Sequence, residues 1–369
     1  MKSKTLLPAG LLLALFAAAA VGQDDAVFTT GVDVVDVLAT VRDQHGRLVN
    51  DLDKDDFILK EDGSLQTIKY FSRQTDLPLT IGLLVDTSLS QRRLIDQERS
   101  AGYEFFRRVV DESKDQAFVI SFDYDVELLQ DLTGSKQLLQ QGLERLSLPL
   151  EPQFRARRQQ QRQQWDQQQF PGGGNPGGRS RWPFPRGDRR GGGGSGGPGA
   201  RTTAGAVGTA MFDAVYLAAA EVLHDQAGRK AIVLISDGVD VGSKVAAEQA
   251  IEAAQRADAV IYSVFYSDEE GYQMRAGGRP GAGAGGWRPN GEYALESLCK
   301  QTGGRLYKLS GELTLAGVFE QIEDELRNQY SIGYTPTNAT GSSAFRRISL
   351  TGRNDKLKVY TRAGYYPQD

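Results

Sequence analysis

Two stretches of the chain are continuously apolar, and each leads directly into an aspartate. "LTIGLLVD" ends at Asp86 and "KAIVLISD" ends at Asp237. Apolar runs without polar alternation are typical of strands that helices cover on both faces of a parallel sheet. Ligands bind to such open sheets at the carboxyl ends of the strands. If the two strands are neighbours, both aspartates lie at one ligand-binding edge.

Strand and helix patterns alternate between residues 77 and 329. The pattern predicts strands over 79–86, 116–123, 126–132, 229–240, 259–266 and 304–309. It predicts helices over 94–111, 135–146, 208–227, 243–258, 293–303 and 314–329. This alternation favours an α/β fold with a doubly wound, mostly parallel six-stranded sheet.

The segments on either side, 24–75 and 330–367, contain β patterns of a different kind, with turns and β-branched residues. Each segment is too short to form a stable sheet alone. We therefore expect the N-terminal and C-terminal segments to pair into one small β-rich domain beside the α/β domain, 77–329.

The N-terminus has the pattern of a secretory signal peptide, residues 1–22. Lys2 and Lys4 precede an apolar stretch, 6–20, and small residues follow at 20–22. An uncleaved membrane anchor is the alternative, although the apolar run is short for a span. We expect cleavage and export of the mature chain, without a further membrane span, to the periplasm or the extracellular space.

Two low-complexity inserts, 151–204 and 276–291, interrupt the α/β pattern. Residues 151–201 contain ten arginines and three acidic residues, a local charge of +7 in a chain of net charge −4. Segments of this composition cannot bury enough apolar surface to order themselves. Three roles are open for them: flexible filler, surfaces that stack on polyanions, or segments that cover or supplement the ligand-binding edge of the sheet. Nucleic acid is not the expected partner.

Hydroxyl side chains accompany the two aspartates. Ser88 and Ser90 follow Asp86 at alternate positions, and Thr209 stands at the start of a predicted helix. Taken singly, Asp86, Ser88 and Thr209 have the pattern of helix N-caps, and Asp237 that of a turn. Taken together, two carboxylates and three hydroxyls form an all-oxygen shell that suits Mg²⁺, with Mn²⁺ or Ca²⁺ as alternatives.

At these residues the chain resembles the von Willebrand factor A (VWA) domain family, over about 77–329. "DTSLS" is similar to its D-x-S-x-S motif, "GTAMFDAV" to its threonine element and "ISDGVD" to its last aspartate element. The flanking segments resemble exported bacterial members. The resemblance implies a metal-ion-dependent adhesion site (MIDAS), with Ser88, Ser90 and Thr209 on the metal and Asp86 and Asp237 acting partly through water. A partner's Asp or Glu carboxylate would complete the coordination.

Three functions are compatible with this pattern. The favoured one is an exported, non-enzymatic protein-binding module of the adhesion type; the alternative is a metal-independent extracellular or envelope protein that assembles through its Arg/Gly-rich inserts. A metal-dependent hydrolase is disfavoured, because His45 and His224 are expected to be exposed and Cys299 to be buried. Asp240 is expected to be a solvated loop carboxylate. The partner and the oligomeric state are not specified by the sequence.

Overall fold

The computed structural model describes residues 34–74, 77–88, 94–147, 209–266, 291–337 and 344–367. The predicted signal peptide and the two predicted inserts lie outside these residues, except that Gly291 begins a helix. In the described part of the chain, no helix is long and apolar enough to cross a membrane.

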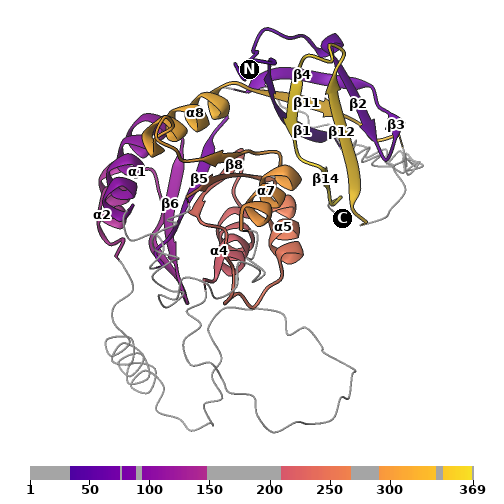
Figure 1. Cartoon of the computed structure of the whole chain (residues 1–369). Coiled ribbons are helices and arrows are strands. Elements are labelled where there is room, and N and C mark those ends of the chain that lie inside the picture. Colours follow the sequence, from indigo (N-terminus) through magenta and orange to yellow (C-terminus); the bar gives the residue numbers. More distant parts are fainter. Residues whose placement is uncertain are drawn as a thin grey trace, which may run out of the picture. The chain divides into compact units, whose positions relative to one another are not determined.

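The secondary structure follows the alternation predicted from the sequence (Figure 1). The strands are β1 (Val35–Arg42), β2 (Phe57–Glu61), β3 (Ser64–Leu65), β4 (Ile68–Gln74), β5 (Leu79–Asp86), β6 (Gln116–Phe122), β7 (Val126–Thr133), β8 (Arg229–Ser236), β9 (Ala259–Phe265), β10 (Leu306–Lys308), β11 (Gln329–Tyr334), β12 (Arg346–Gly352), β13 (Lys358–Thr361) and β14 (Gly364–Tyr365). The helices are η1 (Lys54–Asp56), α1 (Ile95–Val109), α2 (Lys136–Glu144), α4 (Met211–Leu217), η3 (Ala218–Leu223), α5 (Ala247–Arg256), α7 (Gly291–Thr302) and α8 (Leu315–Arg327).

One six-stranded sheet forms the centre of the α/β part, in the order β10-β9-β8-β5-β6-β7. All neighbouring strands are parallel except β6 and β7, which form an antiparallel pair. Every residue of β5 is buried, as the continuous apolar run predicted. The doubly wound, mostly parallel sheet is confirmed, and β5 and β8 are neighbours within it.

Helices cover both faces of this sheet and form two separate apolar cores. Side chains of α1, α2 and α8 pack on one face, and side chains of α4, η3, α5 and α7 pack on the other. The predicted helix over 208–227 is an α-helix, α4, that continues as the π-helical η3. Cys299 of α7 is buried, and His45 and His224 are exposed, as expected.

The terminal segments form two further four-stranded sheets, in the orders β13-β1-β11-β4 and β14-β12-β2-β3. N-terminal and C-terminal strands alternate in the first sheet, where β1 pairs with β11, and they meet once in the second sheet, where β2 pairs with β12. A third apolar core, which includes Phe57, Tyr330 and Tyr334, lies between the sheets. The expected pairing of the two terminal segments is therefore confirmed, and their two sheets are called the β part below.

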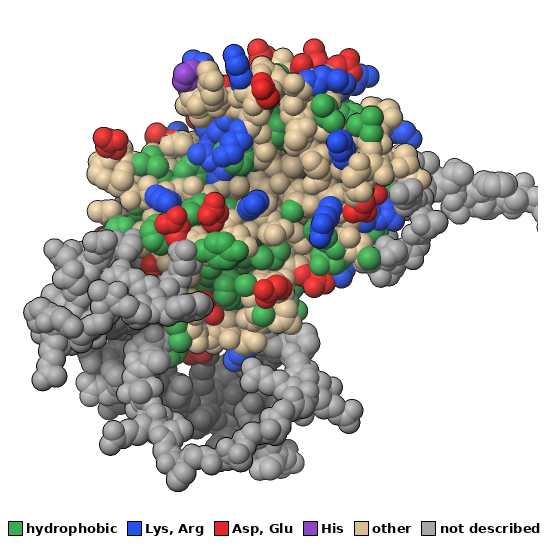
Figure 2. Space-filling view, turned by 45° about the vertical axis from the view of Figure 1, so that its right-hand side comes forward, with side chains coloured by type: hydrophobic (Ala, Val, Ile, Leu, Met, Phe, Trp, Pro, Cys, Tyr) green, Lys and Arg blue, Asp and Glu red, His purple; other side chains and the backbone are tan. Residues whose placement is uncertain are grey.

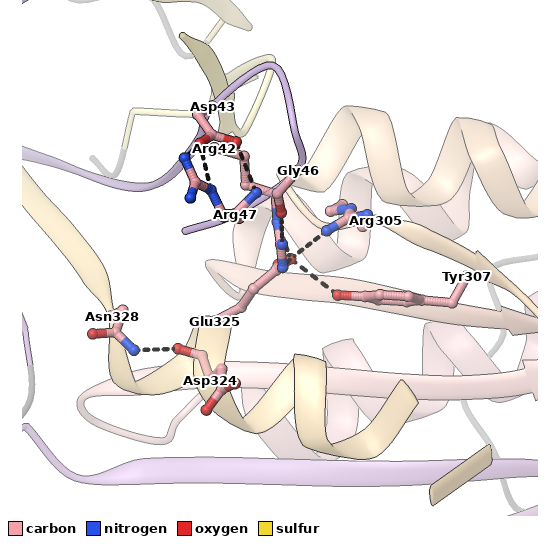
Figure 3. A network of polar contacts seen from close by, with 9 residues as sticks. All are labelled: Arg42, Asp43, Gly46, Arg47, Arg305, Tyr307, Asp324, Glu325 and Asn328. Atoms are coloured by element: carbon pink, nitrogen blue, oxygen red, sulfur yellow. Dashed lines mark hydrogen bonds and ion pairs between the residues drawn. The ribbon is translucent and has the colours of Figure 1, made fainter. Parts of the chain in front are cut away.

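A buried polar network joins β1 to α8 and β10 (Figure 3). Arg42 of β1 donates hydrogen bonds to Oε1 of Glu325 from Nε at 3.0 Å and from Nη2 at 2.5 Å. Arg305 and the Tyr307 hydroxyl donate to the same oxygen, each at 2.9 Å. The Glu325 side chain is only 1% exposed, so these three donors supply the partners that a buried carboxylate requires.

Arg229, the first residue of β8, holds together the two segments that lead from the α/β part into the β part. Its guanidinium donates to the carbonyl of Leu77, just before β5, at 3.2 Å. It also donates to the carbonyl of Leu326, at the end of α8. The entry and exit of the α/β part therefore lie beside each other.

Candidate metal centre

The end of β5 places Asp86 at the carboxyl edge of the sheet with its side chain fully buried. Its Oδ1 accepts a hydrogen bond from the backbone N–H of Ser88 at 2.9 Å. Its Oδ2 accepts one from the hydroxyl of Ser236, on the neighbouring strand, at 2.7 Å. Both carboxylate oxygens of Asp86 are thus held in place, one by the last residue of β8 and the other by the backbone just after β5.

Asp237 directly follows β8 and reaches the same edge. Because Val85 pairs with Ile235 in the parallel register, Asp237 lies about one residue further along its strand direction than Asp86 does. Its side chain is 4% exposed, and Oδ1 accepts the backbone N–H of Val239 at 3.0 Å. The sequence prediction that two neighbouring strands each deliver a carboxylate to one edge holds in the structure.

Two of the three predicted hydroxyl residues are described, and both are buried near this edge: Ser88 is 3% and Thr209 is 7% exposed. The carbonyl of Thr209 accepts the backbone N–H groups of Val241 and Gly242 at 3.1 and 3.0 Å, which ties it to the loop after Asp237. Ser90 lies outside the described residues.

Thr209 does not cap the helix that follows it, so the N-cap alternative for this residue does not hold. The N-cap of α4 is Ala210, and its side chain makes no capping hydrogen bond. Asp240 performs this role from the loop after β8: its Oδ1 accepts the N–H groups of Met211 and Phe212 at 2.8 and 3.3 Å. Asp240 is half-buried, so the expectation that it is a solvated loop carboxylate was wrong.

Removal of this cap gives a testable prediction. Asp240→Ala should lower the free energy of unfolding by about 1 kcal/mol, because two N–H groups of α4 lose their acceptor. Asp240→Asn keeps an oxygen acceptor and should retain most of that stability. Urea unfolding of both variants at equal m value measures the difference. Equal losses in both would show that the charge of Asp240, rather than its hydrogen bonds, stabilises α4.

The electrostatics of this edge favour a bound proton or a bound cation. Burial, followed by the nearby charge of Asp237, raises the pKa of Asp86 to about 7. Two close carboxylates repel each other unless a proton or a cation lies with them. The surrounding donors are carboxylate and hydroxyl oxygens, the ligands that Mg²⁺ and Ca²⁺ prefer. Among the described residues no three His, Cys, Asp or Glu side chains gather as a metal-ligand group, so the hydroxyls of Ser88 and Thr209 would be needed.

Sequence reasoning missed two groups that shape this site and one buried carboxylate that lies near Asp86. Ser236 holds Asp86 and also accepts the N–H of Gly238 at 2.9 Å. The carbonyl of Asp123 accepts the N–H of Ala210 at 2.6 Å, which fixes the residue after Thr209. Glu98 is a fully buried glutamate on α1. Only Glu98 had a sequence signal, because it falls on the apolar stripe of its helix.

Three large apolar side chains are exposed on segments that contact the site. Tyr124 is 38%, Val241 58% and Tyr293 69% exposed. Tyr124 follows Asp123, Val241 donates to Thr209 through its backbone, and Tyr293 lies in the first turn of α7. Exposed aromatic side chains beside polar groups are common where protein partners bind.

No family model matches the chain, and no curated protein matches it. Solved structures match in fold. Proximal thread matrix protein 1 (PTMP1) from the mussel byssus has 11% identity and a TM-score of 0.44, over 72% of this chain and 51% of that chain. The same protein with a zinc-occupied MIDAS motif has 12% identity and a TM-score of 0.42, over 71% and 49%.

A third match is the vWF domain of the type V pili tip protein Mfa5 from Porphyromonas gingivalis, with 11% identity and a TM-score of 0.38, over 68% of this chain and 95% of that chain. This chain thus spans about half the length of the mussel protein. Because the TM-scores of these three structures are no higher than 0.44, their functions are not assigned to this chain. The chain is similar to them in part of its fold.

Proposed function

We propose that this chain is an exported binding module that captures an acidic group of a partner protein through a divalent cation, with Mg²⁺ as the first candidate. The observation that carries the proposal is the buried pair Asp86 and Asp237, delivered by neighbouring strands to one edge together with Ser88 and Thr209. The order of the three motifs, which resembles the VWA family, supports the same function. The proposal contains no enzymatic step.

Each residue has a defined part in holding the ion. The hydroxyls of Ser88, Ser90 and Thr209 would bind it, and Asp86 and Asp237 would neutralise its charge. When bound, the cation supplies a position at which a carboxylate oxygen from another protein replaces water. Asp86 is kept in place for this role by Ser236 and by the backbone of Ser88.

The surroundings of the site support a protein as the partner. The exposed Tyr124, Val241 and Tyr293 offer apolar contacts beside the carboxylate-binding position, and aromatic side chains are enriched at protein interfaces. On the face shown in Figure 2, basic and acidic side chains are interspersed. This face of the described residues therefore carries no large patch of one charge of the kind that attracts nucleic acid.

Thermal unfolding of the mature protein in EDTA, Mg²⁺, Mn²⁺ and Ca²⁺ tests the metal site. Free metal at 100 times its dissociation constant should stabilise the native state by about 2.7 kcal/mol, which raises the unfolding midpoint. Asp86→Asn keeps the size of the side chain and removes its charge, and should abolish the response. Asp131→Asn, an exposed position on β7, is the matched control and should respond like the wild type.

A wild-type midpoint that is the same in EDTA and in every metal would contradict the proposed function. If metal does bind, a displayed library of random peptides selected on the Mg²⁺-loaded protein tests the partner chemistry. Enriched peptides should share an Asp or Glu, and EDTA should release them. Peptides that stay bound in EDTA would instead favour the alternative function, assembly without metal.

A further inference from the structure

Glu98 is a buried carboxylate without a visible partner. It lies on the face of α1 that packs against the sheet, together with Ile95, Gly102, Phe105 and Val109. The residue is 0% exposed, and neither Oε1 nor Oε2 has a hydrogen-bond partner. Among the described buried side chains, Glu98 has the only carboxylate with both oxygens unpaired.

The packing of α1 on β5 places Glu98 beside the metal edge. A Cβ added at Gly102 would lie 3.2 Å from a methyl of Leu83, so Gly102 packs against Leu83. Because β5 and β6 are parallel, the connecting helix α1 runs back along the sheet, and its N-terminal end is near the carboxyl end of β5. Glu98 is four residues before Gly102, about 6 Å along the helix axis. At about 3.3 Å per strand residue, this corresponds to about two residues beyond Leu83, next to Val85 and Asp86.

The electrostatic surroundings of Glu98 agree with that placement. Burial, followed by the nearby charge of Asp86, raises the pKa of Glu98 well above its usual range. Arg99 follows it in the helix, but its guanidinium binds Asp96 and the carbonyl of Leu146 instead. A buried carboxylate that accepts no hydrogen bond is costly, and a cation with its bound water would provide the missing partners.

We propose that Glu98 is a third carboxylate of the metal site. It lies on the core side of Asp86 and attracts the cation from there. This inference rests on the proposed function, and it extends the site beyond the residues that the sequence motifs contain. Because the three carboxylates do not converge as a direct ligand group, Glu98 acts as a positioning residue. It strengthens cation binding through its charge and through water held between it and the ion.

A purely structural role for Glu98 makes a different prediction. If the side chain only filled space in the core, its replacement by the equally large glutamine would leave metal affinity unchanged. If it belongs to the metal site, glutamine removes a costly unpaired carboxyl group from the metal-free protein and an attractive charge from the metal-bound protein. Stability without metal and affinity for metal should then change in opposite directions.

Calorimetric titration with Mn²⁺ alone, combined with thermal unfolding in EDTA, measures both quantities. Glu98→Gln in the mature protein should raise the Mn²⁺ dissociation constant about 10- to 100-fold, as loss of supporting carboxylates does at other metal sites. Its unfolding midpoint in EDTA should be equal to or above that of the wild type. Glu98→Asp, which keeps the charge, should bind Mn²⁺ more tightly than Glu98→Gln. Glu104→Gln, on the exposed face of the same helix, should change neither quantity.

Each possible result is decisive. Equal Mn²⁺ affinity in wild type and Glu98→Gln would overturn the role of Glu98 and leave the proposed function standing. A wild type that does not bind Mn²⁺ would overturn both. Weaker binding in Glu98→Gln, with an undiminished midpoint in EDTA, is the expected result, and no structural role in the core would produce it.

Discussion

Replacement of Glu325 by alanine is expected to lower the free energy of unfolding by about 3–5 kcal/mol, the range for breaking a buried ion pair by removing one partner. Arg42 and Arg305 both direct their guanidinium groups at Oε1 of this side chain. Without Glu325, the buried Arg42 would retain its positive charge without a counter-ion. The Tyr307 hydroxyl would lose its acceptor as well.

Chemical denaturation followed by tyrosine fluorescence and by far-ultraviolet circular dichroism measures this loss. Glu320→Ala is the matched control, because Glu320 lies on the same helix and forms an exposed ion pair with Arg108. Such surface pairs contribute about 0–1 kcal/mol. Similar losses in the two variants would show that the buried network contributes no more than a surface pair. A second transition in Glu325→Ala alone would show that the β part and the α/β part have become uncoupled.

Replacement of Gly238 by alanine is expected to destabilise the protein by about 2–5 kcal/mol and to weaken the response to metal. Gly238 has a positive φ of 72°, which costs an alanine about 1–2 kcal/mol. An added Cβ would also lie 2.1 Å from the carbonyl oxygen of Gly291. This contact is with backbone, so the loop after Asp237 or the start of α7 must move.

Gly63→Ala separates these two effects. Gly63 has a similar φ of 82°, but an added Cβ there meets no atom within 4 Å. Gly63→Ala should lose only the stability that a positive φ costs an alanine, about 1–2 kcal/mol. It should bind metal like the wild type. Thermal unfolding with and without Mn²⁺ compares them. If Gly238→Ala lost no more stability than Gly63→Ala, the close approach of the two backbones would be unimportant.

The main sheet could be predicted from the sequence because its physical cause is local. β5 and β8 are continuous apolar runs, and only a strand covered on both faces requires such a run. Each run is followed by a carboxylate, so Asp86 and Asp237 were placed at the edge from chain order alone. The pairing of the two terminal segments also followed from a simple argument, since neither can form a stable sheet by itself.

The errors concern contacts between residues that are distant in the sequence. Asp240 was expected to be solvated, yet it caps α4 from another loop, and no local pattern specifies that contact. Glu98 was hidden in the polar run Asp96 to Arg99, although its spacing from Gly102 and Phe105 places it on the buried stripe. Glu325 likewise lies on the buried stripe of its helix, α8, close to Ile322 and Leu326. A glutamate on an apolar stripe is therefore a usable signal for a buried functional or structural carboxylate.

The pairing of N-terminal with C-terminal strands has a consequence for the order of folding. Val35 must pair with Tyr334, and closing a loop of that length in an unfolded chain costs entropy that grows with the logarithm of its length. Once the α/β part has folded, Arg229 holds Leu77 and Leu326 beside each other, and the two halves of the β part are joined by a short, rigid connection. The β part should therefore form last, so that β1 and β4 remain without their shared partner, β11, until that strand has been synthesised.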